Sequence, residues 1–375
     1  MTIFLKIVFL VLTIGVGIGL YFLFKYIFAP NYNVEPGVSY QQEIFTAGEH
    51  GYYCYRIPAL LALPDDNILA FCEARKNSCS DYGNIDLVMK KSSDAGRTWS
   101  DMQVLWDAGE LAVQNPMPVY DEDTGQILLG CMKDRTETYI FKSSDDGITW
   151  SAPEHLSKVK PSNWNILGVA PGHGIVLESG RILFAGMSQK NETWQSHCIY
   201  SDDHGKSWTL GYVFEEEFNE CLAVELSNGN VMMILRRNRH LSDEHYVFTS
   251  ISKDGGETFD EPKPNLDLIT PVCQASICQF TTDDAYERNR LLFSNPSSFR
   301  RNMMTIKCSY DDGKHWDIER LLYPGPTAYS DLAVLSNNVI CCLFENGRRG
   351  RYERLTFIKF DLEWLVRGTD SLQKK

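Results

Sequence analysis

Three arginines occupy positions from which their guanidinium groups could converge. Arg56 lies just before an apolar strand-like run, Arg236 ends the apolar run VMMIL, and Arg300 follows the segment SNPSSF. Guanidinium groups that face one point repel one another unless an anion compensates them, and the planar guanidinium fork matches a carboxylate. A single arginine of this kind would more commonly form a weak surface salt bridge. The three together predict a site for a ligand that carries a carboxylate.

Such a convergence requires a fold that brings distant segments to one axis. Five copies of one short box recur roughly every 54 residues, a period typical of propeller blades or solenoids. The copies are SSDAGRTW from Ser92, SSDDGITW from Ser143, SDDHGKSW from Ser201, SKDGGETF from Ser252 and SYDDGKHW from Ser309. Each follows a strand-like run, so we expect a hairpin turn in which Ser and Asp bond backbone amides, Gly supplies a positive φ, and Trp or Phe packs between sheets. The boxes are predicted to hold the fold together and to contact no substrate.

A second series of turn signals alternates with the boxes. It comprises PDDN at 64–67, DTG at 123–125, SG at 179–180, NGN at 228–230, TDD at 282–284 and SNN at 336–338. Short runs rich in β-branched and large apolar residues lie between the two series. Together they predict an all-β fold, a six-bladed β-propeller with four-stranded antiparallel blades. We expect the last blade to lack a box and to be closed by a strand from near the start of the domain.

An uncharged apolar stretch precedes this domain. Residues 7–24, IVFLVLTIGVGIGLYFLF, are flanked by Lys6 and Lys25. The stretch is long enough for a transmembrane helix and longer than the apolar core of a signal peptide, which favours an uncleaved signal anchor over a cleaved signal. A span of this kind would place the domain outside the cytosol, in a lumen or at the cell surface. The predicted organisation is an anchor at 1–30, a linker at 31–40, the propeller at 41–365 and a tail at 366–375.

The composition limits the classes of partner and cofactor. The formal net charge is −13, so the surface should repel nucleic acid. The 11 cysteines form an odd set, so at least one lacks a partner within the chain. Cys72 with Cys79 and Cys273 with Cys278 are candidate disulfides. No zinc-binding spacing or nucleotide phosphate loop occurs in the sequence, and we expect neither a metal nor a cofactor.

A series of short motifs follows in a distinctive order. They are YRIP at 55–58, EARKNSCSDYG at 73–83, NECLAVEL at 219–226, SNPSSFRRNMMTI at 294–306, GPTAYSDLA at 325–333 and FENGR at 344–348. Together they resemble the exo-α-sialidases, most nearly the lysosomal-type animal enzymes and their bacterial relatives. The resemblance covers about residues 40 to 362. It implies a propeller glycoside hydrolase that removes terminal sialic acid.

The resemblance also implies which side chains bind the sugar acid. Arg56, Arg236 and Arg300 match the arginine triad of the family, which binds the carboxylate of sialic acid. Glu345 would orient Arg56, and Arg75 would line the same pocket. Two members of the triad belong to Arg-Arg doublets, and motif spacing favours the first arginine of each. Because side chains alternate along a strand, the two neighbours of a doublet should point opposite ways.

The implied catalytic set differs from that of most glycosidases. Asp81 resembles the acid/base of the family, Tyr329 its nucleophile, and Glu220 the base that activates Tyr329. Taken alone, Asp81 would be interpreted as a turn residue and Tyr329 as a half-buried aromatic. Sialic acid carries a carboxylate on its anomeric carbon, and an anionic nucleophile about 4 Å away would be repelled by roughly 4 kcal/mol at a dielectric constant near 20. A neutral phenol avoids this repulsion, and two successive displacements retain the configuration.

Three functions are compatible with these residues. The leading hypothesis is a membrane-anchored retaining exo-sialidase that acts without a cofactor on glycoproteins, glycolipids such as gangliosides, and oligosaccharides. A trans-sialidase would pass the sugar to an acceptor, and the lack of an added lectin-like domain disfavours it. A non-catalytic propeller receptor or scaffold would explain the repeats and the anchor but not the ordered motifs. The resemblance further suggests the lysosome or the cell surface as the location, and a stabilising protein partner.

Overall fold

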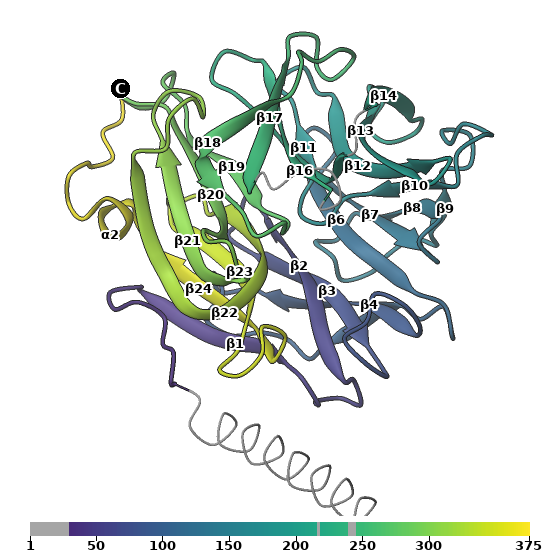
Figure 1. The fold of residues 1–375 in the computed structure, drawn as a ribbon, viewed down its shortest axis with the longest axis horizontal. Helices are drawn as coiled ribbons and strands as arrows, with labels where there is room; N and C mark the ends of the chain where they lie inside the picture. Colours follow the sequence, from purple (N-terminus) through teal and green to yellow (C-terminus); the bar gives the residue numbers. More distant parts are fainter. Residues whose placement is uncertain (1–29, 216–217, 239–244) are drawn as a thin grey trace, which may run out of the picture.

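The fold consists almost entirely of antiparallel β-sheets. The computed structural model describes residues 30–215, 218–238 and 245–375. Figure 1 shows the sheets arranged around a common centre, and the chain passes from one sheet to the next in sequence order. The all-β, propeller-like architecture predicted from the repeats is therefore confirmed.

Within the described residues, three sheets have four strands each. They contain β2 (Cys54–Ala62), β3 (Ile68–Arg75), β4 (Ile85–Ser92) and β5 (Gln103–Trp106); β6 (Val113–Asp121), β7 (Gln126–Lys133), β8 (Glu137–Ser143) and β9 (Glu154–His155); and β15 (Phe218–Glu225), β16 (Val231–Arg237), β17 (Tyr246–Ser252) and β18 (Lys263–Ile269). A fourth sheet contains β10 (Ile166–Val169), β11 (Ile175–Val176), β12 (Ile182–Lys190), β13 (Thr193–Ser201) and β14 (Thr209–Phe214). Consecutive strands pair antiparallel, as hairpins require.

The remaining sheet has seven strands and contains both ends of the propeller-like domain. Its members are β1 (Tyr40–Thr46), β19 (Ser276–Thr281), β20 (Arg290–Pro296), β21 (Asn302–Ser309), β22 (Ile318–Val334), β23 (Ile340–Asn346) and β24 (Arg354–Phe360). The long strand β22 pairs with β21 through its first half and with β23 through its second half. Strand β1 pairs antiparallel with β24, so a strand from the start of the domain closes the last sheet, as the sequence predicted. A short helix, α2 (Leu362–Val366), follows β24.

The five boxes form the hairpin turns that their composition predicts. In the first box, the Ser92 hydroxyl donates to Asp94 and accepts the Gly96 N–H, and Asp94 Oδ1 accepts the Thr98 N–H at 2.8 Å. The same bonds recur in the other four boxes. The box tryptophan at position 99 packs edge-to-face on Phe357 in β24, which joins the first and last sheets. No box residue in the described chain lines the polar cavity that holds the predicted site residues.

One disulfide is present among the described residues, and it differs from both candidate pairs. Cys54 bonds Cys79, with a Cα–Cα distance of 5.8 Å. Both pairs proposed from the sequence are therefore wrong. Cys72 is buried in the middle of β3, whereas the loop after β3 returns Cys79 to the start of β2. Sequence separation could not reveal this return of the chain.

The predicted anchor at 7–24 lies outside the described residues. Within the part of the chain that the structure describes, no helix has the length and apolar character needed to cross a bilayer.

Candidate active site

Four strands that lie near the centre of the fold share one irregularity. In β2, β6, β15 and β22 the pairing register shifts close to a cluster of polar side chains, which marks a β-bulge in each. The residues inside these shifts include Ile57, Asn115, Glu220 and Tyr329. Ile57 and Asn115 have φ angles of 60° and 55°. Because bulges re-aim side chains, they turn residues from four separate strands toward one shared space.

A cavity of about 230 Å³ occupies this space. Most of the predicted site residues line it: Arg56, Arg75, Asp81, Glu220, Arg236 and Tyr329. The fold thus brings together side chains that are far apart in the sequence. Two predicted residues are not on its surface. Glu345 is fully buried behind Arg56, and Arg300 lies on an exposed turn.

Glu345 in β23 holds two walls of the cavity in place. Its Oε1 accepts the Nε–H of Arg56 and the backbone N–H of Ile57, both at 3.0 Å. Its Oε2 accepts the backbone N–H of Tyr329 at 3.1 Å. A buried side chain that accepts several hydrogen bonds fixes the positions of its donors. Glu345 therefore sets the positions of the guanidinium of Arg56 and the backbone of Tyr329.

Asp81 lies in the irregular loop between β3 and β4, with its side chain 56% exposed. Its Oδ1 accepts hydrogen bonds from Arg75 at 2.8 Å and from Arg56 at 2.9 Å. Burial raises the pKa of Asp81, but Arg75 and Arg56 outweigh burial, so the pKa lies below its usual value. In this structure Asp81 is therefore an ionised carboxylate held between two guanidinium groups.

Tyr329 and Glu220 form the centre of the cavity. The Tyr329 hydroxyl donates a hydrogen bond to Glu220 Oε1, and Arg236 Nη1 donates to Glu220 Oε2 and to the Tyr329 hydroxyl. Tyr329 is 6% exposed. Burial and the Glu220 charge raise the pKa of Tyr329 well above its usual value, in spite of Arg236. The phenol is therefore neutral and already hydrogen-bonded to a carboxylate that can accept its proton.

The sequence predicted Arg300 as the member of its doublet that binds the ligand, but Arg301 lines the cavity and Arg300 does not. The Arg301 guanidinium lies 5.5 Å from the centre of the Tyr329 ring and donates to the Tyr352 hydroxyl at 3.0 Å. A tight turn at the end of the loop, closed by the bond from Asn302 N–H to the Arg300 carbonyl, directs Arg300 to solvent. Strand alternation could not decide between the two, since both precede β21. In the other doublet, Arg236 faces the cavity.

Several lining residues were not identified from the sequence. They are Ile57, Glu73, Gln114, Asn115, Met132, Arg135, Met187, Trp194, Asn219 and Tyr352. The Arg56 guanidinium lies over the Tyr352 ring, with its central carbon 4.1 Å from the ring centre. One signal was available: Asn115 precedes Pro116 at the start of an inner strand, just as Ile57 precedes Pro58. The repeated X-Pro step marks the bulge in both strands.

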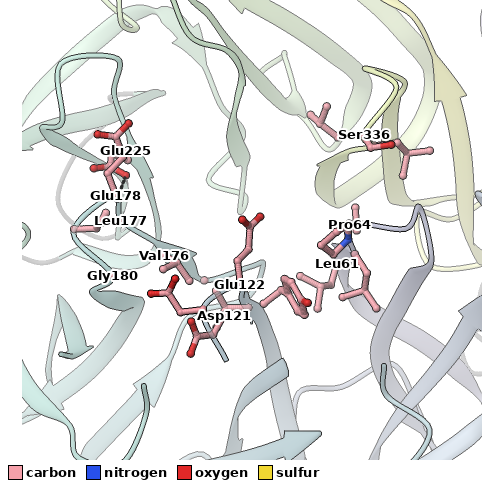
Figure 2. A pocket seen from close by; sticks show the side chains of 18 residues that line it. Leu61, Pro64, Asp121, Glu122, Val176, Leu177, Glu178, Gly180, Glu225 and Ser336 are labelled. Carbon is pink, nitrogen blue, oxygen red and sulfur yellow. Dashed lines mark hydrogen bonds between the residues drawn. The ribbon is translucent and has the colours of Figure 1, made fainter. Parts of the chain in front are cut away.

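A larger cavity of about 770 Å³ lies at the other ends of the same inner strands, and Figure 2 shows its lining. Its charged side chains are all acidic: Asp121, Glu122, Asp123, Glu178 and Glu225. No Arg or Lys is among the described residues that line it. A carboxylate ligand would be repelled there, so the smaller cavity is the site that fits the predicted chemistry.

One group of side chains in the described ranges could hold a metal ion. Asp121, Asp123 and His204 place ligand atoms within 4.8 Å of one another. His204 Nδ1 already hydrogen-bonds Asp121 Oδ2 at 2.9 Å. The group belongs to the acidic end of the fold, so it does not bear on the chemistry around Tyr329.

Comparisons with known sequences find a repeat-domain family and several sialidases. Residues 66–341 match the model of the BNR repeat-like domain. The sialidase of Micromonospora viridifaciens is 29% identical over 360 residues, covering 87% of this chain and 54% of that protein. Sialidase-3 of Mus musculus is 28% identical over 411 residues, covering 87% of this chain and 95% of that protein. The chain thus spans about half of the bacterial relative and nearly all of the mouse relative.

A solved structure shows the same architecture. The Hadza microbial sialidase Hz136 superimposes with a TM-score of 0.78 at 26% identity, covering 87% of this chain and 69% of that chain. The sialidase relatives and the solved sialidase structure identify the chain as a glycoside hydrolase. With its BNR repeat-like domain, the chain belongs to the exo-α-sialidase family.

Proposed function

We propose that this protein is a retaining exo-α-sialidase that hydrolyses terminal sialic acid through a tyrosine nucleophile. One observation carries the proposal: the Tyr329 hydroxyl donates to Glu220, while the guanidinium groups of Arg56, Arg236 and Arg301 line the same cavity. A neutral nucleophile with a base beside it and cations around it matches a substrate that carries its own carboxylate at the reacting carbon.

The arginines bind the substrate carboxylate. Among the described residues, no carboxylate lies within salt-bridge distance of Arg301, which donates to the Val272 carbonyl and the Tyr352 hydroxyl instead. The Nε of Arg236 is buried and has no hydrogen-bond partner within the described part of the chain. Both groups retain donor capacity, and burial makes an unpaired donor costly. A ligand carboxylate would satisfy them.

The first displacement joins the anomeric carbon to the Tyr329 oxygen while the phenolic proton passes to Glu220. The raised pKa of Tyr329 keeps the phenol neutral until that step. As the substrate carboxylate pairs with Arg56, the bond from Arg56 to Asp81 weakens. Asp81 then takes up a proton more readily and donates it to the departing glycosidic oxygen. In the second displacement Asp81 accepts a proton from the water that attacks the anomeric carbon. The bond to the Tyr329 oxygen breaks, the phenol regains its proton from Glu220, and net retention follows.

We also propose the broader organisation expected from the sequence. The seven-stranded sheet would represent two blades joined by β22, which gives six blades in all. Residues 7–24 would anchor the domain to a membrane of the lysosome or cell surface, with the domain in the lumen or outside. Its substrates would be sialylated glycoproteins, glycolipids and oligosaccharides, and a protein partner could stabilise it. The two halves of β22, which pair with different strands, support the count of blades.

Two substitutions test the proposal. Tyr329→Phe and Asp81→Asn should each abolish most hydrolysis of a fluorogenic sialoside while far-UV circular dichroism stays unchanged. Tyr310→Phe is the matched control, because its hydroxyl also bonds a carboxylate, Asp370, but outside the cavity. Full activity in either variant would refute the mechanism. A fluorinated sialic acid should label Tyr329 covalently, as read by peptide mass, and product analysis with lactose present would separate hydrolysis from transfer.

A further inference from the structure

An exposed aromatic ring lies beside the proposed acid. Tyr82 directly follows Asp81 in the loop between β3 and β4, and 70% of its surface is exposed. The side chain of Arg135 connects the two residues, because its guanidinium contacts the Tyr82 ring and its charge acts on the Asp81 carboxylate. Tyr82 does not line the cavity itself. Because Asp81 and Arg135 both line the cavity and Arg135 contacts the Tyr82 ring, Tyr82 lies at the cavity rim on the side of the proposed acid.

Arg135 supports this ring from the neighbouring sheet. Its guanidinium lies 4.2 Å from the centre of the Tyr82 ring, in cation–π contact. Arg135 also lines the cavity. The pair thus spans from the cavity wall to the outer rim, and one face of Tyr82 is occupied by a cation while the remaining surface is largely open.

The turn that presents Arg135 is conformationally unfavourable. Asp134 and Arg135 have φ angles of 50° and 59°, and the Thr136 N–H bonds the Lys133 carbonyl at 3.1 Å. This is a type I′ hairpin turn, which favours Asn-Gly because both central residues need a positive φ. A long side chain in this conformation is uncommon and more often found at functional sites. The cost is consistent with a role for the Arg135 side chain.

The chemistry places the leaving group next to this pair. The acid must protonate the glycosidic oxygen at hydrogen-bond distance, so the sugar on the far side of that oxygen emerges past Asp81. The C–H-rich face of a pyranose ring is apolar and can bury itself against an aromatic face. We propose that Tyr82, braced by Arg135, forms the subsite for the neutral hexopyranose to which sialic acid is attached. This inference rests on the proposed sialidase function and adds its leaving-group specificity.

The experiment compares two sialosides that differ only in the leaving group: a sialyl-galactoside disaccharide and methyl α-sialoside. The measured quantity is the ratio of kcat/KM on the disaccharide to kcat/KM on the methyl sialoside. In Tyr82→Ala this ratio should fall about tenfold, which corresponds to about 1.4 kcal/mol. In Tyr82→Phe it should stay within about twofold of wild type, because the ring and not the hydroxyl makes the contact. Arg135→Met should give an intermediate fall.

Tyr53→Ala is the matched control, since Tyr53 is a tyrosine of similar exposure, 60%, whereas the Arg135 guanidinium contacts the ring of Tyr82. An unchanged ratio in Tyr82→Ala would overturn the subsite, and so would an equal loss on both substrates, which would mean that Tyr82 acts only through Asp81. A fall of the same size in Tyr82→Phe would also overturn it. If the wild-type protein hydrolysed neither sialoside, the proposed function itself would fail, which is a distinct result.

Discussion

One carboxylate oxygen of Glu345 accepts the backbone N–H of Tyr329 at 3.1 Å. The other oxygen accepts the Nε–H of Arg56. The residue that positions the proposed nucleophile therefore also positions an arginine of the carboxylate site. Glu345 has no exposed surface, so its influence on substrate must pass through the residues that it bonds, Arg56, Ile57 and Tyr329. It is a positioning residue, and its loss should affect both binding and chemistry.

Replacing Glu345 with Gln should lower kcat/KM by about two orders of magnitude. The substitution removes a charged acceptor, and a hydrogen bond to a charged group is worth about 1.5–3 kcal/mol. The new amide N–H₂ would also face a donor. Steady-state kinetics on a fluorogenic sialoside would measure the loss.

Asp370→Asn is the control for this substitution. Arg290 is buried and bonds the Asp370 carboxylate at 2.7 and 2.9 Å, outside the cavity. This variant should lose stability in urea but keep its kinetic constants. Equal kinetic losses in both variants would mean that Glu345 acts on the fold alone.

The Arg-Arg doublet in the loop after β20 provides a direct test of the carboxylate site. Arg301→Ala should raise KM about 100-fold, because truncating one partner of a buried charge pair typically costs 2–5 kcal/mol. Arg300→Ala should change KM less than about twofold, because Arg300 is exposed on the turn. Kinetics on both variants with one substrate would decide the matter. A larger effect at Arg300 than at Arg301 would contradict the site described above.

The disulfide should matter for both stability and chemistry. Cys79 is tied to Cys54, and its carbonyl accepts a hydrogen bond from Arg75 at 2.7 Å, two residues before Asp81. Replacing both cysteines with Ser should lower the free energy of unfolding by about 3 kcal/mol, the value expected for a closed loop of this length. The double substitution should also lower kcat about tenfold, because the loop that carries the proposed acid, Asp81, would be less well positioned.

Urea denaturation and steady-state kinetics, with and without a reductant, would measure these effects. Cys278→Ser is the control, because Cys278 is a free cysteine in a different sheet. A reductant should slow wild type and leave the double variant unaffected. Unchanged kcat in the double variant would show that the loop holds Asp81 without the disulfide.

A buried histidine should make stability depend on pH. His173 Nδ1 lies 2.8 Å from Asp331 Oδ1 in β22, two residues after Tyr329. Burial lowers the pKa of His173, but Asp331 outweighs burial and the pKa is raised above 6.5. A raised folded-state pKa contributes stability that is fully present below pH 6.5 and is lost as the pH rises through the folded value. The protein should therefore gain stability from this pair on the acid side.

His173→Gln should be more destabilising at pH 5.5 than at pH 9. Guanidinium unfolding of wild type and variant at both pH values would measure the difference. His197→Gln is the contrasting variant. Burial lowers the pKa of His197 to about 3, so this variant should be less destabilising at pH 5.5 than at pH 9. An equal loss at both pH values would mean that His173 contributes only its neutral hydrogen bond.

The sequence alone was enough to predict the repeating architecture and six of the side chains that line the cavity. In the first box the Ser92 hydroxyl and the Asp94 carboxylate bond groups of their own turn, so local composition was enough to predict such a turn. Short motifs likewise identified two candidate residues, Arg56 in YRIP and Tyr329 in GPTAYSDLA. These features depend on neighbours in the chain, which a sequence displays directly.

Only the tertiary structure decided between Arg300 and Arg301, paired Cys54 with Cys79, and brought Tyr352 beneath Arg56. It also revealed that Glu345 serves both Arg56 and Tyr329. Each of these facts depends on how a loop returns to a distant strand, and the free energy of such a contact comes from groups that are remote in sequence. A sequence shows which residues are present, but it does not show which side chains a turn directs toward a distant strand.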